Sequence, residues 1–299
     1  MVNLELYRVF YTVAKCGSLT KAAEELYISQ PAVSQSIKQL ENQLGVRLFN
    51  RTHRGMELSA QGGKMIFSEV ERALGLLSVA ENRVAEMQTK ASGLIRIGAS
   101  DTIFEYFLAD KIVDFHEKFP AVKIELMADF TPDTIEKLKA NRCDVAFVNL
   151  PIEVDSDLIL RGNCMRLNDI FIVGEKYRQL ANGDTMSLST LKEYPLIMMD
   201  KNTVARRSLD NFLGAHGLEL TPSIEVGSWD LMKRLVARGM GVGIIPREYA
   251  QGRLKDGELF EVKTDPALPT RSVGILLPKN TSASYALHSF IQFVLKGTF

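Results

Sequence analysis

The sequence has few of the residue patterns that catalytic, metal-binding and membrane proteins require. Its three cysteines lie far apart, with no Cys-x-x-Cys pair and no histidine cluster near them, so neither a disulfide framework nor a zinc site is expected. It has no Gly-x-Ser-x-Gly or His-Glu-x-x-His motif, and no apolar run approaches the length of a membrane span. We therefore expect a cytoplasmic protein that is not an enzyme, with no metal, no cofactor and no membrane partner. Two interpretations of Cys143 and Cys164 stay open, namely small semi-buried residues or redox-sensing thiols.

Net charge is also absent, because 36 Lys and Arg balance 36 Asp and Glu. Its distribution is uneven. The segment from Met1 to Lys64 contains eight Lys or Arg against five Glu and no Asp, an excess of three positive charges. This excess is modest, so an electrostatic affinity for nucleic acid would be weak for a single copy of this segment and would favour a dimer or a larger assembly.

The segment from Ser18 to Glu41 has the pattern of a helix-turn-helix, with a surface helical hairpin as the alternative. Ser18 is a candidate N-cap for a first short helix, and the helical pattern is interrupted at Tyr27. Ser29 is a candidate N-cap for a second helix with an apolar stripe on one face. The opposite face is polar and can reach base edges and phosphates from the major groove. The candidate DNA-binding residues here are Ser29, Gln30, Pro31, Ser34, Gln35 and Lys38.

A helix before the helix-turn-helix and two strands after it are expected to complete a DNA-binding domain, called the head below. A helix with an apolar face is expected to begin after Asn3 and to pack under the hairpin. Beyond the hairpin, two short strands at 46–49 and 56–59, joined by a polar loop, are expected to form a wing. Arg51 and Arg54 in that loop are placed to meet phosphate or the minor groove.

Residues 60–88 contain no proline and show a sustained heptad spacing. Steps of four and three residues are typical of the narrow seam of a coiled coil. The seam consists of Ile66, Val70, Ala73, Leu77, Ala80, Val84 and Met87. We expect a helix of about 28 residues, spanning about 42 Å, that joins two chains. The alternative is a helix that lies on its own domain.

Beyond Gly93 the pattern changes to alternating strands and helices, which predicts parallel sheets with crossover helices. The first set comprises strands at 94–98, 122–126 and 145–148 and helices at 102–119 and 134–140. The second set comprises strands at 170–173, 196–199, 223–226 and 243–245 and helices at 205–216 and 229–238. The last segments, at 259–262, 273–277 and 283–295, are expected to return to the first lobe.

These patterns predict an α/β chain in three parts. They are a winged helix-turn-helix DNA-binding domain at 1–60, a linker and dimerisation helix at 61–90, and a two-lobe, periplasmic-binding-protein-like effector domain at 91–299. Lobe I is expected at about 91–162 and 266–299, and lobe II at about 163–265. Two α/β lobes with a cleft between them form a ligand-binding architecture.

Polar residues follow several of the expected strands, where open α/β sheets bind ligands and helix N-termini present N–H groups. The candidate effector-binding residues are Ser100, Thr102, Asn149, Asn202, Thr203 and Ser228. Hydroxyls and amides at helix starts, with no balancing cluster of acids, favour a small anion. The alternative is that each of these residues only caps its own helix.

The order of the parts resembles the LysR-type transcriptional regulators of bacteria over the whole chain. The most specific residues are Phe10, Ser18, Ala22-Ala23, Ser29-Gln30-Pro31-Ala32-Val33-Ser34, Ile37, Leu40-Glu41, Leu44-Gly45, Leu48-Phe49, Arg51 and Leu58. The resemblance implies DNA contacts from Gln30, Pro31, Ser34 and Gln35 in the recognition helix and from Arg51 in the wing. It also implies an effector held against Ser100, Thr102 and Thr203, in a site that Val204 narrows because it replaces a usual glycine.

The implied function is that of a sequence-specific transcriptional regulator controlled by a small, anionic effector. Its expected partners are double-stranded promoter DNA, the effector, and further copies of the chain, as a homodimer through the linker helix and a homotetramer. RNA polymerase is an additional candidate partner. Two other classes are a two-lobe ligand-binding or transferase-like protein whose head serves another role, and an architectural DNA protein without a ligand. The absence of catalytic motifs argues against the first, and the polar cleft argues against the second.

Overall fold

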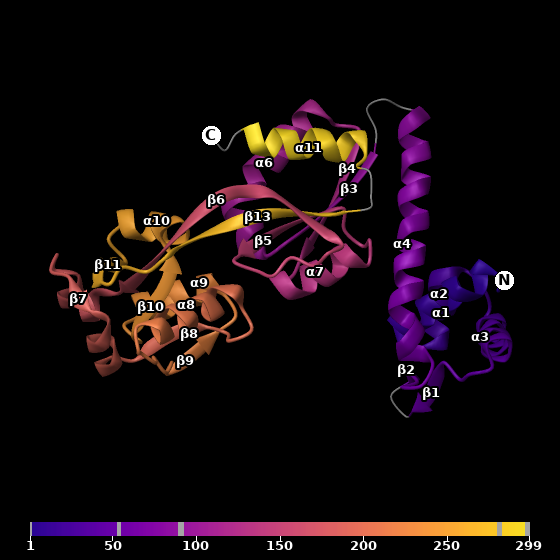
Figure 1. Ribbon diagram of the computed structural model, residues 1–299, viewed down its shortest axis with the longest axis horizontal. Coiled ribbons are helices and arrows are strands. Elements are labelled where there is room, and N and C mark those ends of the chain that lie inside the picture. The colour runs from indigo at the N-terminus through magenta and orange to yellow at the C-terminus, as the bar shows by residue number, and fades with distance from the viewer. Residues whose placement is uncertain (1, 53–54, 89–92, 280–282, 297–299) are drawn as a thin grey trace. The chain divides into compact units, whose positions relative to one another are not determined.

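The computed structural model describes residues 2–52, 55–88, 93–279 and 283–296 (Figure 1). Contacts divide the chain into two units, Met1–Ala85 with Ala140–Arg142, and Glu86–Lys139 with Cys143–Phe299. Within the described ranges, no helix combines the length and the apolar character that crossing a bilayer requires.

Three helices open the first unit, α1 (Leu4–Cys16), α2 (Leu19–Leu26) and α3 (Gln30–Leu44). Side-chain caps fix their starts, as expected from the sequence. Asn3 Oδ1 accepts a hydrogen bond from Glu5 N at 2.9 Å, and the Ser18 and Ser29 hydroxyls accept from Lys21 N and Ala32 N at 3.4 Å each. The three helices share one core, with buried side chains from Phe10, Val33, Ile37 and Leu40.

The wing consists of strands β1 (Phe49–Thr52) and β2 (Gly55–Leu58), paired antiparallel with Phe49 opposite Leu58. The first strand was expected at 46–49, but β1 begins only at Phe49 and continues to Thr52. The reason is that Leu48 N donates to the Glu41 carboxylate and not to the opposite strand, although Leu48 O still accepts from Ser59 N, the residue opposite it in the register. The long helix expected from about residue 60 to residue 88 is confirmed as α4 (Gly63–Gln88).

The second unit contains one nine-stranded sheet with the order β4-β3-β5-β13-β6-β10-β8-β9, and β11 also pairs with β6. Two long strands, β6 (Leu158–Val173) and β13 (Thr270–Pro278), lie side by side and antiparallel (Figure 1). The expected strand at 170–173 was therefore only the end of β6. Residues 158–168 pair with β13, and the following residues pair with β10 and β11.

Lobe I is built on β3 (Gly93–Ala99), β4 (Val122–Ala128) and β5 (Val145–Leu150). Successive β5 side chains point to opposite faces. Phe147 packs in the cluster that includes Phe115 of α6 (Ala109–Lys118) and Phe290 of α11 (Tyr285–Lys296). Val148 packs instead with Leu138 of α7 (Thr131–Lys139). Helices thus cover both faces, and the last strand and helix return to lobe I as expected. The strand expected at 259–262 does not return to lobe I, because as β11 it pairs with the last residues of β6 in lobe II.

The helix expected at 102–119 is interrupted. A short helix α5 (Asp101–Ile103) is followed by one π-helical turn, η1 (Phe104–Leu108), before α6 begins at Ala109. Such turns are rare and occur mostly within α-helices near functional sites.

Lobe II contains β8 (Leu196–Met199), β9 (Ile224–Val226), β10 (Val242–Pro246) and β11 (Phe260–Val262). Its helices are α8 (Val204–Ala215), α9 (Trp229–Ala237) and α10 (Arg247–Lys255). The sequence did not predict α10, because its segment is polar and contains Gly252, a poor helix former. Two 3-10 helices (Glu175–Ala181 and Leu188–Glu193) and the small pair β7 (Met186–Ser187) and β12 (Thr264–Asp265) were also not predicted.

Candidate DNA-binding surface and candidate effector site

The candidate DNA-binding surface is the polar face of α3. Capping by Ser29 and an apolar stripe toward the core orient this helix, so that Gln30, Gln35 and Lys38 are exposed and Ser34 is half-buried. Within the described part of the chain, no residue is hydrogen-bonded to the side chains of Gln30, Gln35 and Lys38. Amide and ammonium groups of this kind can bind base edges and phosphates without first breaking a bond to the protein.

The wing adds Arg51, an exposed residue of β1 that lies opposite Met56 in the ladder. The structure therefore places Arg51 on the same unit as the recognition helix. Arg54, the other predicted wing residue, lies outside the described residues.

The predicted effector residues lie at the starts of helices or the ends of strands, as expected. Ser100 caps α5 by accepting from Ile103 N at 3.4 Å, and Thr102 is half-buried in the same helix. Ser228 caps α9 by accepting from Leu231 N at 3.5 Å. The exposed Asn202 donates its backbone N–H to Asp200 Oδ1 at 2.8 Å. Each hydroxyl cap therefore already has a local structural partner.

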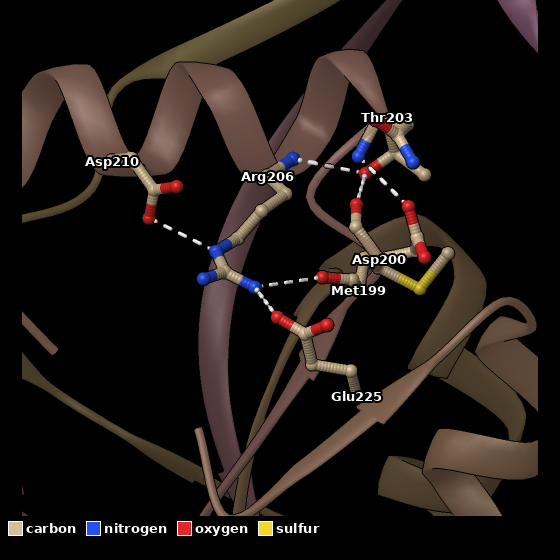
Figure 2. Close-up of polar contacts among 7 residues, drawn as sticks. Met199, Asp200, Thr203, Arg206, Asp210 and Glu225 are labelled. Carbon is tan, nitrogen blue, oxygen red and sulfur yellow. Dashed lines mark hydrogen bonds and ion pairs between the residues drawn. The ribbon is translucent and has the colours of Figure 1, made fainter. Parts of the chain in front are cut away.

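Thr203 shows this most fully (Figure 2). Its side chain is buried, and its hydroxyl donates to Asp200 O at 2.8 Å while accepting from Arg206 N at 3.2 Å. The single hydroxyl proton is thus committed to the turn before α8. Thr203 could offer a ligand only a remaining acceptor lone pair, which does not suit an anion.

Arg206 follows one turn later and is also engaged (Figure 2). Its Nε donates to Asp210 Oδ1 at 3.0 Å, and its Nη1 donates to Glu225 Oε1 at 2.9 Å and to Met199 O at 3.1 Å. Burial lowers the pKa of Arg206, but hydrogen bonds to Glu225 and Asp210 outweigh burial, and the pKa is raised. Two carboxylates therefore compensate the charge of this cation.

A cleft of about 770 Å³ separates α7 and the segment after β5 in lobe I from α8 in lobe II. Its lining includes none of the six predicted effector residues. The polar and charged residues that line it are Thr131, Asp133, Glu136, Glu153, Asp155, Arg207, Ser208 and Asn211. Lys139 pairs with both Glu136 and Asp155, which offsets part of the negative charge. Carboxylates still outnumber the cations, so the charges of the lining do not favour an anion.

Asn149 connects this region to a buried ion pair that the sequence did not reveal. Its backbone N donates to Thr131 Oγ1 at 3.3 Å, and its Oδ1 accepts from Arg271 Nη1 at 3.5 Å. Arg271 on β13 also donates to Asp169 on β6, at 2.5 Å from Nε and 2.7 Å from Nη2. The Arg271 side chain is only 2% exposed. No local signal could identify it, because its partner lies 102 residues away.

The two cysteines considered for redox sensing lie in the protein interior. Cys143 and Cys164 are buried, and burial raises the pKa of Cys164 to about 12. A thiol with such a pKa is almost entirely protonated at neutral pH and reacts slowly with oxidants. Among the described residues, no group of His, Cys, Asp or Glu side chains could hold a metal ion.

Known proteins match both parts of the chain. Residues 4–63 match the family described as bacterial regulatory helix-turn-helix protein, lysR family, and residues 88–298 match the LysR substrate binding domain. The transcriptional regulator YeiE of Escherichia coli K12 is 28% identical over 98% of this chain and 97% of its own length. The activator CmpR of Synechocystis is 28% identical over 81% of this chain and 78% of its own length.

Solved structures show the same fold. The LysR family regulator CbnR is 18% identical with a TM-score of 0.71, covering 100% of both chains. A full-length OxyR variant from Pseudomonas aeruginosa is 19% identical with a TM-score of 0.73, covering 100% of this chain and 95% of its own. Since the matched families cover both the head and the effector unit, the chain belongs to the LysR family of bacterial helix-turn-helix transcriptional regulators.

Proposed function

We propose that α3 reads base edges in the major groove of promoter DNA while Arg51 contacts the backbone, and that the lobes of the effector unit bind a small molecule. The observation that carries the proposal is the exposed polar face of α3. The buried apolar stripe on the other side of this helix orients Gln30, Gln35 and Lys38 toward the solvent. A related protein supports it, because full-length CbnR has been solved in complex with its target DNA. A regulator of chromosomal promoters acts in the cytoplasm, where RNA polymerase is also present.

The regulator acts as a homodimer through α4 and as a homotetramer. Support comes from large apolar side chains on α4 that lie in water in the single chain, since Met65 is 67%, Leu76 52% and Leu77 43% exposed. Leu77 belongs to the predicted seam, whereas Ile66 and Val70 of the seam pack in the core of the head. The side chains of Val84 and Met87 lie outside the described residues. Pairing two heads also doubles the number of phosphate contacts, which compensates for the modest positive charge of each.

The effector binds between the lobes. Support comes from the size of the cleft, which is in the range that small-molecule sites occupy. The six residues predicted from the sequence, and the anionic character inferred from them, remain predictions. We expect the effector to bind without an added metal or cofactor.

Selection of duplexes from a random library by the full-length chain tests the DNA-binding part. We expect enrichment of a site with two half-sites about 10 base pairs apart, or a multiple of that spacing, as for other helix-turn-helix dimers. Selected duplexes should bind at least about a thousandfold more tightly than random duplexes of the same length at physiological salt. Equal binding of selected and random duplexes would refute sequence-specific regulation.

Two further measurements test the assembly and the effector. Light scattering of Leu77→Asp should show a lower mass than wild type, because the seam would then bury an unpaired carboxylate. An unchanged mass would exclude the seam as the interface.

Thermal melting of the full-length chain against matched panels of small anions, cations and neutral metabolites should show a shift in melting temperature for one class. A panel without any shift would contradict the effector-binding proposal.

A further inference from the structure

The backbone that leads into the wing is held by the carboxylate of Glu41. This residue lies near the carboxyl end of α3, and its Oε1 accepts from Leu48 N at 2.7 Å and from Phe49 N at 3.3 Å. Hydrogen bonds to an ionised acceptor are shorter and stronger than neutral ones. The recognition helix is therefore bonded directly to the first residue of β1.

Ser59 holds the same backbone from the side of the linker helix. Its hydroxyl donates to Arg47 O at 2.6 Å and accepts from Gly62 N at 3.2 Å and from Gly63 N at 2.9 Å. Its own N–H donates to Leu48 O at 2.8 Å. Ser59 is 6% exposed, so these bonds are shielded from water. One side chain thus caps the start of α4 and anchors the segment before the wing.

Glycines make this close approach possible. A Cβ on Gly62 would lie 2.6 Å from Arg47 O, and a Cβ on Gly63 would lie 2.1 Å from Leu48 O. Both distances are far below van der Waals contact, so the first turn of α4 packs against the backbone itself. The other strand of the wing is fixed to the residue that ends α1, because Met56 N donates to Gly17 O at 2.8 Å.

We propose that Glu41 and Ser59 are positioning residues of the DNA-binding head. They hold residues 47–49 between α3 and α4, and this sets where Arg51, two residues beyond Phe49, meets the DNA backbone. Because the segment is bonded to both helices, a change in the direction of α4 moves the wing and the recognition helix together. The inference rests on the proposed DNA binding by α3 and Arg51.

A double-mutant cycle tests the inference, with the full-length chain and a duplex selected by the wild type from a random library. Arg51→Ala is measured in the wild-type, Ser59→Ala and Glu41→Ala backgrounds. We expect Arg51→Ala to weaken binding about tenfold in the wild type and less than about threefold in the other two, because coupled residues are non-additive. Hydroxyl-radical footprints of Ser59→Ala and Glu41→Ala should lose protection of the deoxyriboses at the wing flanks, while protection of guanine N7 in the major groove from dimethyl sulfate should persist.

Conservative and matched variants separate positioning from general destabilisation. Glu41→Gln keeps an acceptor oxygen, so most of the tenfold effect of Arg51→Ala should return in that background. Ser68→Ala on the exposed side of α4 and Glu24→Gln on α2 should leave the effect unchanged. If Ser59→Ala does not fold by circular dichroism, the contrast between Glu41→Ala and Glu41→Gln decides the question.

Additive losses would overturn the positioning role. In that case Arg51→Ala would weaken DNA binding about tenfold in every background, even if Ser59→Ala or Glu41→Ala lowered the melting temperature of the head. A wild-type chain that binds selected and random duplexes equally would instead refute sequence-specific binding, which is a different result from additive losses on a tightly bound site.

Discussion

Two sets of polar side chains, one on α3 and one at the strand ends of the effector unit, were predicted to bind ligands but have different surroundings. On α3 the amides of Gln30 and Gln35 are exposed, and none of the described residues is hydrogen-bonded to them. In the effector unit, the hydroxyls of Ser100, Thr203 and Ser228 are engaged as helix caps. Hydroxyls at helix starts therefore predict caps first, and only exposure of the donor atoms indicates a binding surface.

Charged groups differ between the two units in the same way. In the head, the Arg8–Glu5 pair is about half exposed and joins residues of one helix. In the effector unit, Arg271–Asp169 joins β13 to β6, and Arg96 on β3 pairs with Asp144 just before β5. Exposed pairs contribute little to stability, whereas breaking a buried pair leaves an uncompensated charge. The two buried pairs of the effector unit thus hold strands together.

The largest expected effect follows from the buried pair. Arg271→Met should lower the free energy of unfolding of the effector unit by about 3–5 kcal/mol, because Asp169 would keep a buried charge without its partner. Urea unfolding followed by the fluorescence of Trp229, the single tryptophan of the chain, measures this loss. The matched control Arg178→Met removes a mostly exposed pair with Glu175 and should cost less than about 1 kcal/mol. Similar losses for both variants would remove the contrast between buried and exposed pairs.

On the head, Gln35→Ala should weaken binding to the selected duplex by about 1–3 kcal/mol, with a much smaller loss on random DNA. The reason is that an exposed amide at the amino-terminal half of α3 can bond to one base edge. The control is Gln43→Ala, two turns further along the same helix and away from the end that enters the groove. Fluorescence anisotropy with both duplexes measures the losses. Equal weakening on selected and random DNA would assign Gln35 to the backbone instead.

Thr203 gives a smaller and more discriminating test. Thr203→Ala should destabilise the effector unit by about 0.5–2 kcal/mol through loss of the cap, and Thr203→Ser should restore most of it. The measurement is urea unfolding without any ligand. A Thr203→Ala variant that unfolds like the wild type but loses the thermal shift of an effector would show a ligand contact rather than a cap.

The smallest effect is expected for the thiols. At pH 8 the native chain should expose one reactive cysteine, Cys16, to a disulfide reagent, and the denatured chain should expose all three. Burial raises the pKa of Cys164 from 9.0 to about 12, so the folded state holds this proton more tightly than the unfolded state. Its contribution to stability is therefore present below pH 9 and is lost as the pH rises toward 12. Rapid native labelling of Cys164 at pH 8 would contradict its burial.

The parts that sequence predicted well are those with local causes. Asn3, Ser18 and Ser29 cap helices a few residues away, and the apolar run at 145–148 forms β5 as expected. The full length of β6 was not predicted, because residues 158–168 pair with β13 about a hundred residues later. The DNA-binding face follows from local patterns, whereas Arg271 and the hydroxyl of Thr203 depend on partners that only folding identifies.

The long strand β6, which pairs with β13 and also with strands of lobe II, determines whether the two lobes of the effector unit can be produced separately. Lobe I and lobe II are not modules joined by flexible linkers, because β6 pairs with β13 along its first part and with β10 and β11 along its last. A fragment cut at the lobe boundary would leave each half with a strand lacking its neighbour, and such unpaired edges promote aggregation. The two lobes are therefore best expressed, crystallised and engineered as one indivisible piece.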